Sequence, residues 1–558
     1  MEDKSGSADL SAPFERDIIL EVRSSKMKAM PGLTIQSGID KQPRTGRVPV
    51  STLGLDADEH DMIFHGGIDK AVHGYCSSHY PSWQREYPDA ADRFRPGAFG
   101  ENLVTAHMNE RNVCIGDILS VGTGGLVLQV SLPRQPCFKL NHRFQLRNFA
   151  PVTYKLSRTG WYYRVLEEGS VQAGDEIRLK ERRWPGWTIE RVQEYLHRNQ
   201  DDAAMNAELA GVTDMGAESR GAFQSRVAKL EARQKREALG LDAKPVEKWH
   251  KYKLVEKRKE TPRISAFVFE ALEQDPETKA AAYGSHIRFR LPGSGLLRSY
   301  SIVEGNANRF ELGIALEQPS RGGSAYFHGT LEVGDVVEAA RPTTDCKPAG
   351  SKSSHVFIVG GIGITAFLKL IEGYQGIHWN TVVHYAVRSG EEVPFRSRIE
   401  AVGEDALRVY DASKGERMDI AEIVGGLTWN SHLYVCGPRR MMDEARRAVA
   451  AAGLGEDDVH FEAFAADTNG DPFEVEIANR DSRVLQVGSE ETLLEVLKRD
   501  LGGDVVESSC EVGNCGTCKI ALKSGSVDHR GTALLGDEKK TSILSCVSRG
   551  IGRIAIEI

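Results

Sequence analysis

The chain has 558 residues, too many for one hydrophobic core, and this length predicts about three to five domains. Its composition is that of an ordinary globular protein, with 40% hydrophobic and 27% charged residues. The net charge of −8 excludes a broadly basic surface of the kind that binds nucleic acid or acidic lipid.

The N-terminal segment and the cysteines indicate where the chain works. Residues 1–17 are polar and lack the basic start and apolar stretch of a secretory signal. The most apolar stretch, residues 355–371, is interrupted by glycines, so we expect no membrane-spanning segment. Nine cysteines, an odd number, suit a reducing compartment and a metal role better than a disulfide framework. We therefore expect a cytoplasmic protein.

In the first third of the chain, residues 34–80 gather cations around a glycine pair and carry no charged helical face. The residues of this group are Lys41, Arg44, Arg47, His65, Gly66, Gly67, Lys70 and His73. Such a set predicts a site for a phosphate-bearing anion, with a solvent-exposed basic loop as the alternative. The histidines at positions 65, 73 and 79 match no helical pair, which argues against a zinc site.

The segment SLPRQPCFKL, residues 131–140, predicts a stiff loop because two prolines frame it. Arg134 precedes Cys137 and Lys139 follows it. Neighbouring cations stabilise a thiolate, and a thiolate is a metal ligand or a nucleophile. Cys137 is therefore a candidate functional residue, and the alternative is an ordinary buried cysteine.

Two segments in the middle of the chain, residues 288–305 and 321–338, predict a flavin site. They would bring together a guanidinium, an aromatic face, a hydroxyl and a phosphate-facing glycine turn, which are the groups that a flavin needs. The candidate residues are Arg298, Tyr300, Ser301, Gly322, Gly323 and Ser324. Each short motif alone is a weak signal, and their order and spacing strengthen the prediction.

Residues 353–373 predict a buried strand, a glycine turn and a helix. The turn contains Gly360, Gly361 and Gly363, and Thr365 opens the predicted helix. Glycines at such a turn let the backbone approach a pyrophosphate, which the N-terminus of a helix attracts. A strand-to-helix corner that binds nothing is the alternative.

The following segments alternate between strand and helix, which predicts a parallel sheet with ligands at the strand ends. Residues 381–390 predict the next strand, and residues 431–449 predict a strand, a Cys-Gly-Pro turn and a helix. Cys436 would then face a nicotinamide, unless it is only a small buried residue. Residues 388–390 contain no acid to bind the ribose 2′-hydroxyl of NAD, so the choice between NADH and NADPH stays open.

Four cysteines near the C-terminus predict an iron–sulfur cluster. Cys510, Cys515 and Cys518 form a C-x4-C-x2-C pattern, and Cys546 supplies the fourth thiolate. This is the spacing of a plant-type [2Fe–2S] ferredoxin. Zinc would prefer two C-x2-C pairs, and only one is present. Because such a cluster carries one electron at a time, the chain or a partner must supply a donor and an acceptor.

Residues 260–558 resemble the phthalate dioxygenase reductase family. The matching motifs are RSYS at 298–301, RGGS at 321–324, GGIGIT at 360–365, CGP at 436–438, FEAF at 461–464 and the cluster cysteines. The resemblance implies FMN, a nicotinamide cofactor that is preferably NADH, and a [2Fe–2S] cluster, in that order. It also implies that Phe464 stacks near the flavin with Glu462 beside it, and that Cys436 has a catalytic role.

Residues 15–181 resemble MOSC domains, in particular the bacterial group that protects against N-hydroxylated base analogues. The matching motifs are SGIDKQP at 37–43, FHGGIDKAVHGY at 64–75, FGENL at 99–103, IGD at 115–117 and PRQPCFKL at 133–140. The resemblance implies that Cys137 binds the metal of a molybdenum cofactor. The residues it implies for the cofactor pocket are Arg134, His65, Gly66, Gly67, Lys70 and His73.

Together these patterns predict a multidomain chain. The expected parts are a β-rich MOSC domain (15–181), a three-helix module (182–232), a linker (233–259), an antiparallel FMN-binding β-barrel (260–346), an α/β NAD-binding domain (352–460) and an α+β ferredoxin domain (471–558).

The predicted function is an NAD(P)H-dependent oxidoreductase. Electrons would pass through FMN and [2Fe–2S] to a molybdenum cofactor that reduces N-hydroxylated compounds. As alternatives, the chain serves a separate oxygenase, or its MOSC domain carries molybdenum cofactor or sulfur. We expect no nucleic-acid or membrane partner, and the oligomeric state stays open.

Overall fold

The computed structural model divides the chain into two compact units. The first contains residues 1–244 and 350–353, and the second contains residues 245–349 and 354–558. The structure describes residues 11–558 except for 62–65, 239–247, 277, 293–296, 319, 321, 345, 347–348, 465–469, 503–504, 509–510, 514–515, 532 and 535. Among the described residues, no helix combines the length and the apolar character needed to cross a bilayer.

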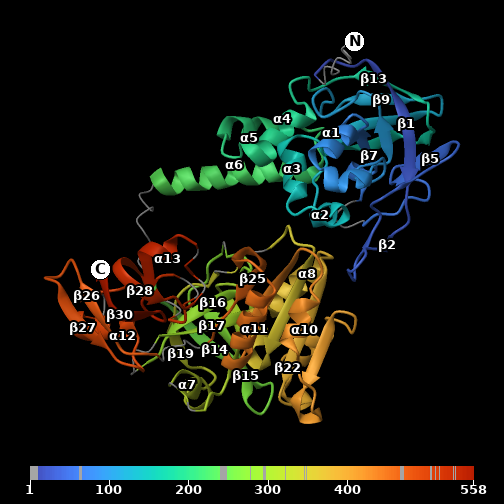
Figure 1. Cartoon of the computed structure of the whole chain (residues 1–558). Helices are drawn as coiled ribbons and strands as arrows, with labels where there is room; N and C mark the ends of the chain where they lie inside the picture. The colour runs from blue at the N-terminus through green and yellow to red at the C-terminus, as the bar shows by residue number, and fades with distance from the viewer. Residues whose placement is uncertain are drawn as a thin grey trace. The chain divides into compact units, whose positions relative to one another are not determined.

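An eight-stranded sheet that closes on itself forms the frame of the first unit (Figure 1). Its order is β13-β9-β10-β11-β7-β8-β1-β4, and β1 also pairs with β13. Neighbouring strands are antiparallel except for the parallel pair β7 and β8. The strands are β1 (Arg16–Ser24), β4 (Gln42–Pro43), β7 (Val72–Cys76), β8 (Leu103–Thr105), β9 (Ile118–Val121), β10 (Leu126–Pro133), β11 (Trp161–Glu167) and β13 (Glu176–Glu181).

Short strands and helices complete this barrel and form a second, aromatic core beside it. The short strands are β2 (Lys28–Ala29), β3 (Gln36–Ser37), β5 (Val48–Ser51), β6 (Gly54–Leu55) and β12 (Gly169–Val171). The helices are η1 (Ile68–Lys70), α1 (His79–Glu86), η2 (Pro88–Arg93), α2 (Phe138–Phe144) and α3 (Phe149–Lys155). Buried rings such as Trp83, Phe94 and Phe99 fill the aromatic core.

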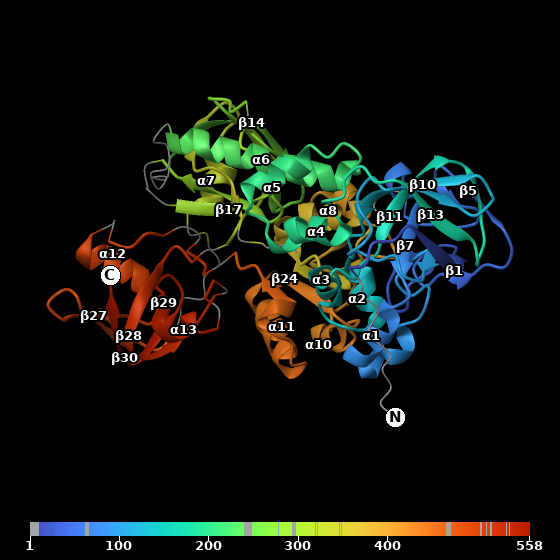
Figure 2. The ribbon, with the colours of Figure 1, turned by 90° about the horizontal axis from the view of Figure 1, so that it is seen from above.

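A helical module follows the barrel and shares its hydrophobic core. Its helices are α4 (Ile189–Gln193), the π-helix η3 (Glu194–Arg198), α5 (Ala203–Ala210) and α6 (Ala217–Ala238). Buried Leu209 and Phe223 belong to the same cluster as the barrel residues. Helices α5 and α6 lie side by side (Figure 2). Helix α6 runs to Ala238, past the expected end of the module at residue 232.

An antiparallel barrel opens the second unit, in the order β17-β18-β15-β14-β19-β16-β20, and β17 closes it by pairing with β16. Its elements are β14 (His250–Lys259), β15 (Ile264–Ala271), β16 (Ser285–Arg290), β17 (Leu297–Gly305), β18 (Arg309–Ala315), α7 (Gly323–Gly329), β19 (Val336–Ala339) and β20 (Thr343–Thr344).

The barrel begins ten residues earlier than the expected boundary at residue 260, because β14 (His250–Lys259, 10 residues) lies inside the segment assigned to the linker. This strand pairs with β15 and with β19. Its Tyr252 and Leu254 are buried, whereas lysines and glutamates occupy most other positions. The high charge of the strand therefore resembled that of a solvated linker.

The nicotinamide-type domain has the predicted parallel sheet, in the order β23-β22-β21-β24-β25. Its strands are β21 (Ser354–Gly360), β22 (Thr381–Val387), β23 (Leu407–Asp411), β24 (Ser431–Cys436) and β25 (Val459–Phe461). Its helices are η4 (Gly361–Ala366), α8 (Leu368–Gly376), η5 (Gly390–Glu392), α9 (Arg396–Glu400), η6 (Ala412–Lys414), α10 (Ile420–Gly425), α11 (Arg439–Ala451) and η7 (Glu456–Asp458).

A mixed five-stranded sheet with one amphipathic helix forms the C-terminal domain, in the order β27-β26-β30-β28-β29. Its elements are β26 (Phe473–Ile477), β27 (Arg483–Val487), α12 (Leu493–Leu501), β28 (Lys519–Asp528), α13 (Glu538–Thr541), β29 (Ser542–Leu544) and β30 (Arg549–Glu557). Thr492 and Glu495 form a capping box at the start of α12, which fixes the beginning of this helix. The fold class predicted from the sequence is confirmed.

Candidate functional site

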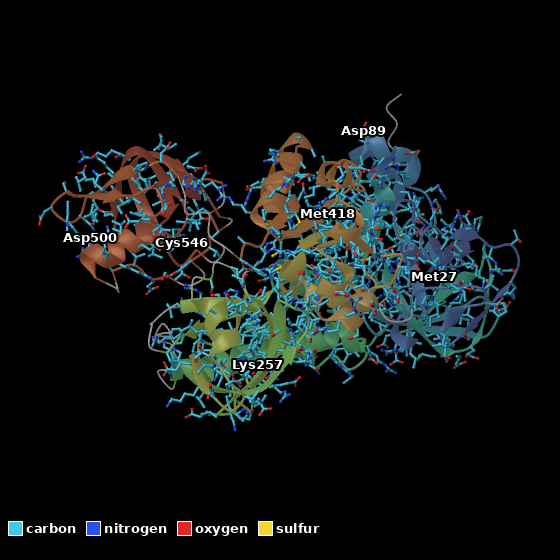
Figure 3. All side chains as sticks on the ribbon, turned by 90° about the horizontal axis from the view of Figure 1, so that it is seen from below. Met27, Asp89, Lys257, Met418, Asp500 and Cys546 are labelled. Atoms are coloured by element: carbon cyan, nitrogen blue, oxygen red, sulfur yellow. The ribbon has the colours of Figure 1, made fainter. Side chains whose placement is uncertain are left out.

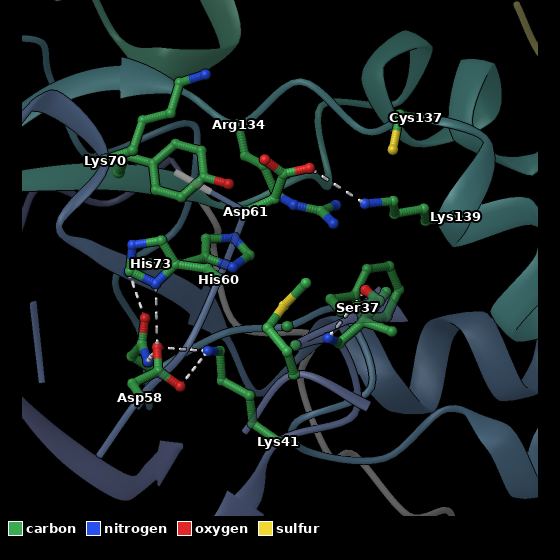
Figure 4. A pocket seen from close by; sticks show the side chains of 17 residues that line it. Ser37, Lys41, Asp58, His60, Asp61, Lys70, His73, Arg134, Cys137 and Lys139 are labelled. Carbon is green, nitrogen blue, oxygen red and sulfur yellow. Dashed lines mark hydrogen bonds and ion pairs between the residues drawn. The ribbon is translucent and has the colours of Figure 1, made fainter. Parts of the chain in front are cut away.

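A pocket in the first unit brings Cys137 together with predicted cations (Figure 4). Lys70, His73 and Arg134 also line it. Gly66 and Gly67 belong to the loop before η1 and are not among the residues that line the pocket in the described part of the chain. His65 lies outside the described residues.

Two cations flank the thiol, as the loop sequence predicted. Cys137 directly precedes α2 and is half-buried. The Lys139 ammonium lies 3.7 Å from a carboxylate oxygen of Asp61. Arg134 is 6% exposed, and its Nη1 is buried with no hydrogen-bond partner among the described residues. A buried guanidinium nitrogen in this state fits an anionic ligand, which would supply the missing acceptor.

Asp58 and His60 are pocket residues that the sequence analysis missed. The Asp58 carboxylate accepts hydrogen bonds from Lys41 Nζ (2.5 Å to Oδ2) and from Asn102 Nδ2 (2.9 Å). His60 Nδ1 lies 3.7 Å from the same carboxylate, and His60 Nε2 is buried and meets no hydrogen-bond partner in the described part of the chain. The only sequence signal was the run of acids around His60, which looks like a solvated loop.

Burial and the neighbouring charges set the protonation states in this pocket. Burial and the adjacent Arg134 hold the pKa of His73 well below its usual value, so this ring is neutral at physiological pH. Burial alone would raise the pKa of Asp58, but the nearby His60 imidazole and the Lys41 ammonium outweigh it and lower that pKa. The pocket therefore contains the ionised Asp58 carboxylate beside His60. The Cys137 thiol, with Arg134 and Lys139 on either side of it in the sequence, lines the same pocket.

The predicted flavin residues come together in the second unit. Arg298 and Tyr300 lie on β17, and α7 begins at Gly323. A Cβ built on Gly323 would lie 2.8 Å from Tyr300 Oη and 2.9 Å from Arg298 Cγ, so the two motifs are in direct contact. The preceding Gly322 has a φ of 92°, which favours glycine. A side chain at position 323 would displace the side chains of Arg298 and Tyr300.

Hydroxyl groups line the same turn. Ser324 Oγ accepts a hydrogen bond from the backbone N–H of Glu317 (3.1 Å) and lies 3.1 Å from Ser320 Oγ. Ser301, on β17, is 9% exposed. The Tyr300 ring packs edge-on against Phe327 with centroids 4.9 Å apart. A glycine turn with hydroxyls, a guanidinium and an aromatic ring fits a flavin phosphate and ring.

The glycine turn after β21 packs directly on Cys436, the last residue of β24. A Cβ built on Gly363 would lie 2.5 Å from the Cys436 carbonyl oxygen and 3.1 Å from its Sγ. The turn is the 3-10 helix η4, and α8 starts only at Leu368, three residues after Thr365. The buried Thr365 bonds its own turn, because its hydroxyl donates to the Ile362 carbonyl (2.8 Å). Gly360, the last residue of β21, and Gly361, the first residue of η4, belong to the same turn.

The predicted acid, Glu462, and the predicted aromatic residue, Phe464, follow β25, the last strand of this sheet. Glu462 follows β25, and its backbone N–H donates to the Val435 carbonyl (2.9 Å). Burial and the nearby Glu462 raise the pKa of Cys436 well above its usual value, so Cys436 is a neutral thiol. Phe464, two residues further along, is 41% exposed among the described residues.

Two of the four predicted cluster ligands meet in the C-terminal domain. The sulfurs of Cys518 and Cys546 are 3.1 Å apart, and both residues are buried. Figure 3 shows Cys546 within this domain. Cys510 and Cys515 lie outside the described residues. Paired buried thiols at the end of a cysteine-rich loop fit iron ligands.

Comparison with known proteins identifies the parts of the chain. The MOSC domain model matches residues 61–178, and the model of the 2Fe-2S iron-sulfur cluster binding domain matches residues 477–549. A protein of Gibberella moniliformis named Reductase is 37% identical over 569 residues, covering 97% of this chain and 95% of that protein. The chain belongs to the family of this reductase.

Two further relatives match only a little more than half of the chain. The heme-dependent oxidative N-demethylase beta subunit of Ectopseudomonas mendocina is 35% identical over 297 residues, covering 53% of this chain and 94% of that protein. The solved structure of phthalate dioxygenase reductase is 27% identical, with a TM-score of 0.42, and covers 56% of this chain and 98% of that one. The chain is thus an iron–sulfur flavoprotein oxidoreductase that joins a MOSC domain to a reductase module.

Proposed function

We propose that the chain transfers electrons from NAD(P)H, through FMN and [2Fe–2S], to a molybdenum cofactor in the MOSC pocket, and that this pocket reduces N-hydroxylated compounds. One observation carries the proposal: a half-buried cysteine lies in a pocket with cations, in the same chain as a reductase module, and one buried guanidinium nitrogen of that pocket has no partner among the described residues. A separate carrier would not need a reductase on the same polypeptide.

In the second unit, the chain's own residues bind and orient two cofactors. Flavin, when bound, accepts a hydride from NAD(P)H and releases single electrons, which a [2Fe–2S] cluster can carry. Gly323 lets Arg298 and Tyr300 pack against the turn at which the flavin phosphate would bind. Gly363 likewise lets the second glycine turn pack on the strand end at Cys436, where the nicotinamide nucleotide would bind.

In the first unit, Cys137 would hold the metal, and Arg134 and Lys139 would balance the negative charge of the cofactor. A molybdenum centre supplies two-electron reduction of an N–O bond. Reduction of R–NHOH consumes two electrons and two protons and gives R–NH2 and water. His60 can hold one of these protons at Nε2, because Asp58 lies beside its other nitrogen.

The proposal is tested with purified full-length protein. It should contain molybdenum, iron and flavin, and oxidise NADH or NADPH with benzamidoxime as the only added acceptor. We expect Cys137→Ala to lower this activity at least about 100-fold and to leave NAD(P)H-dependent cytochrome c reduction unchanged, because a lost metal ligand removes the terminal site alone. Cys76→Ala is the matched control, since Cys76 is a buried cysteine of the same unit that does not line the pocket.

A second candidate is a reductase that supplies a separate oxygenase, with the MOSC domain as an auxiliary part or as a carrier of molybdenum cofactor or sulfur. It is favoured by relatives of the second half, such as the N-demethylase beta subunit and the carnitine monooxygenase reductase subunit of Escherichia coli. If Cys137→Ala reduces benzamidoxime as fast as the wild type, this second candidate replaces the first.

A further inference from the structure

A lysine in the C-terminal domain contacts the segment that carries the cluster cysteines. Lys498 lies in the last turn of α12. Its ammonium donates to Ser508 Oγ (2.6 Å) and to Glu511 Oε1 (3.1 Å), and Ser508 Oγ donates to the same carboxylate oxygen (2.9 Å). The two partners of Lys498 are the second residue before Cys510 and the first residue after it.

This contact is made to a strained residue. Glu511 has a φ of 54°, a left-handed conformation that is unfavourable for a non-glycine residue and persists only where surrounding contacts impose it. The hydrogen bonds from Lys498 and Ser508 are such contacts. The Lys498 and Glu511 side chains are 28% and 35% exposed, so water only partly screens their charges.

Other ion pairs in this domain differ in where the acid lies. Lys523 pairs with Glu557 at 2.6 Å, and Lys519 pairs with Glu538 at 3.0 Å. In both pairs, the carboxylate lies outside the cysteine segment 510–518. In the described part of this domain, the pair Lys498–Glu511 is the one that places its carboxylate inside that segment.

We propose that Lys498 sets the reduction potential of the iron–sulfur cluster by neutralising the Glu511 carboxylate beside Cys510. When one electron passes from the reduced flavin to the cluster, the cluster gains a negative charge, which an uncompensated carboxylate next to a ligand would oppose. The potential of such clusters depends on nearby charge and hydrogen bonding. Lys498 therefore makes the cluster a better electron acceptor from the flavin, whatever the final acceptor is.

The test is an EPR-monitored redox titration of the full-length protein loaded with flavin and iron. Lys498→Met keeps most of the side-chain stem and removes the charge, so the midpoint potential of the cluster should fall. We expect a change of about threefold to tenfold in the one-electron equilibrium, where tenfold corresponds to about 59 mV. Lys498→Arg should retain the wild-type potential, and Glu511→Gln should raise it.

Two comparisons make the test decisive. Lys523→Met removes an equivalent surface lysine of the same domain and should leave the potential unchanged. The double variant Lys498→Met/Glu511→Gln should return close to the wild-type value, because the removed charges cancel. An unchanged or raised potential in Lys498→Met, or an equal fall in Lys523→Met, overturns the proposal. If Lys498→Met does not assemble a cluster, Glu511→Gln alone decides it, because an unchanged potential there also overturns it.

Discussion

At the scale of single residues, the buried pair of Lys41 and Asp58 is the charged feature on which the MOSC pocket depends. The Lys41 and Asp58 side chains are 5% and 2% exposed. Removing one partner of such a pair leaves an uncompensated buried charge, which costs about 3–5 kcal/mol. The pair therefore fixes the wall of the pocket that carries His60.

We expect Asp58→Asn to lower the unfolding temperature of the first unit clearly, in differential scanning calorimetry of the full chain. Glu59→Gln is the control, because the neighbouring Glu59 is 45% exposed and, within the described residues, its carboxylate contacts exposed Lys26 and a backbone N–H. The pKa of Asp58 is lowered in the folded state, so its contribution is present above the unfolded carboxyl pKa and is lost as the pH falls. The difference between variant and wild type should therefore shrink in acid; a difference that stays constant contradicts this account.

A second prediction at this scale concerns Gly323. In Gly323→Ala, the new methyl group would lie 2.8 Å from Tyr300 Oη and 2.9 Å from Arg298 Cγ, so these two side chains must shift. Overpacking of this kind costs about 1–3 kcal/mol, which corresponds to roughly fivefold to 150-fold weaker FMN binding. The affinity is measured by titrating FMN into protein from which the flavin has been removed and following flavin fluorescence.

Gly329→Ala is the matched control for the flavin site. Gly329 ends the same helix, and a Cβ there would meet no atom within 4 Å among the described residues. FMN should therefore bind to this variant as it binds to the wild type. Equal FMN affinity of Gly323→Ala and Gly329→Ala would show that the turn is not the flavin-phosphate site.

Single residues also mark the limit of sequence reasoning. Cys137 with its flanking cations was predictable, because all three belong to one short loop. Asp58 was not, because its role comes from Lys41 and Asn102, which lie in distant segments. A sequence without alignment does not tell which of several acids in a polar loop folds inward.

At the scale of elements, the parallel sheet was predictable and strand β14 was not. Strands β21 and β24 are buried at every position, so they read as continuous apolar runs. In β14 only Tyr252 and Leu254 are fully buried, and the remainder looks like a solvated linker. Tertiary pairing with β15 and β19 decides its conformation.

The position of β14 gives a prediction about fragments. A reductase fragment of residues 248–558 retains β14 and should be soluble and bind FMN. A fragment of residues 260–558 lacks this strand, which leaves the edges of β15 and β19 unpaired, and it should aggregate or lose FMN. Size-exclusion chromatography with detection of flavin absorbance distinguishes the two. Equal flavin content in both fragments would mean that β14 is dispensable for the barrel.

At the scale of the whole molecule, the presence of a MOSC domain and a reductase module in one chain bears on function. Joining two modules in one chain makes their encounter intramolecular, with an effective concentration in the millimolar range for a short flexible linker. The match to the Gibberella moniliformis relative covers 97% of this chain, whereas the match to the N-demethylase beta subunit covers 53%. The electron delivery proposed above would give a physical reason for joining the MOSC domain to a reductase.

The most direct measurement of this delivery is an anaerobic single-turnover experiment on the fully loaded chain. The protein is reduced with a limited amount of NADH or NADPH and then mixed with benzamidoxime, while the flavin and cluster absorbance is followed. The account predicts that both chromophores reoxidise in the wild type, with one benzamidine formed per two electrons, and stay reduced in Cys137→Ala. Chromophores that stay reduced in the wild type, or that reoxidise equally in both proteins, would contradict it.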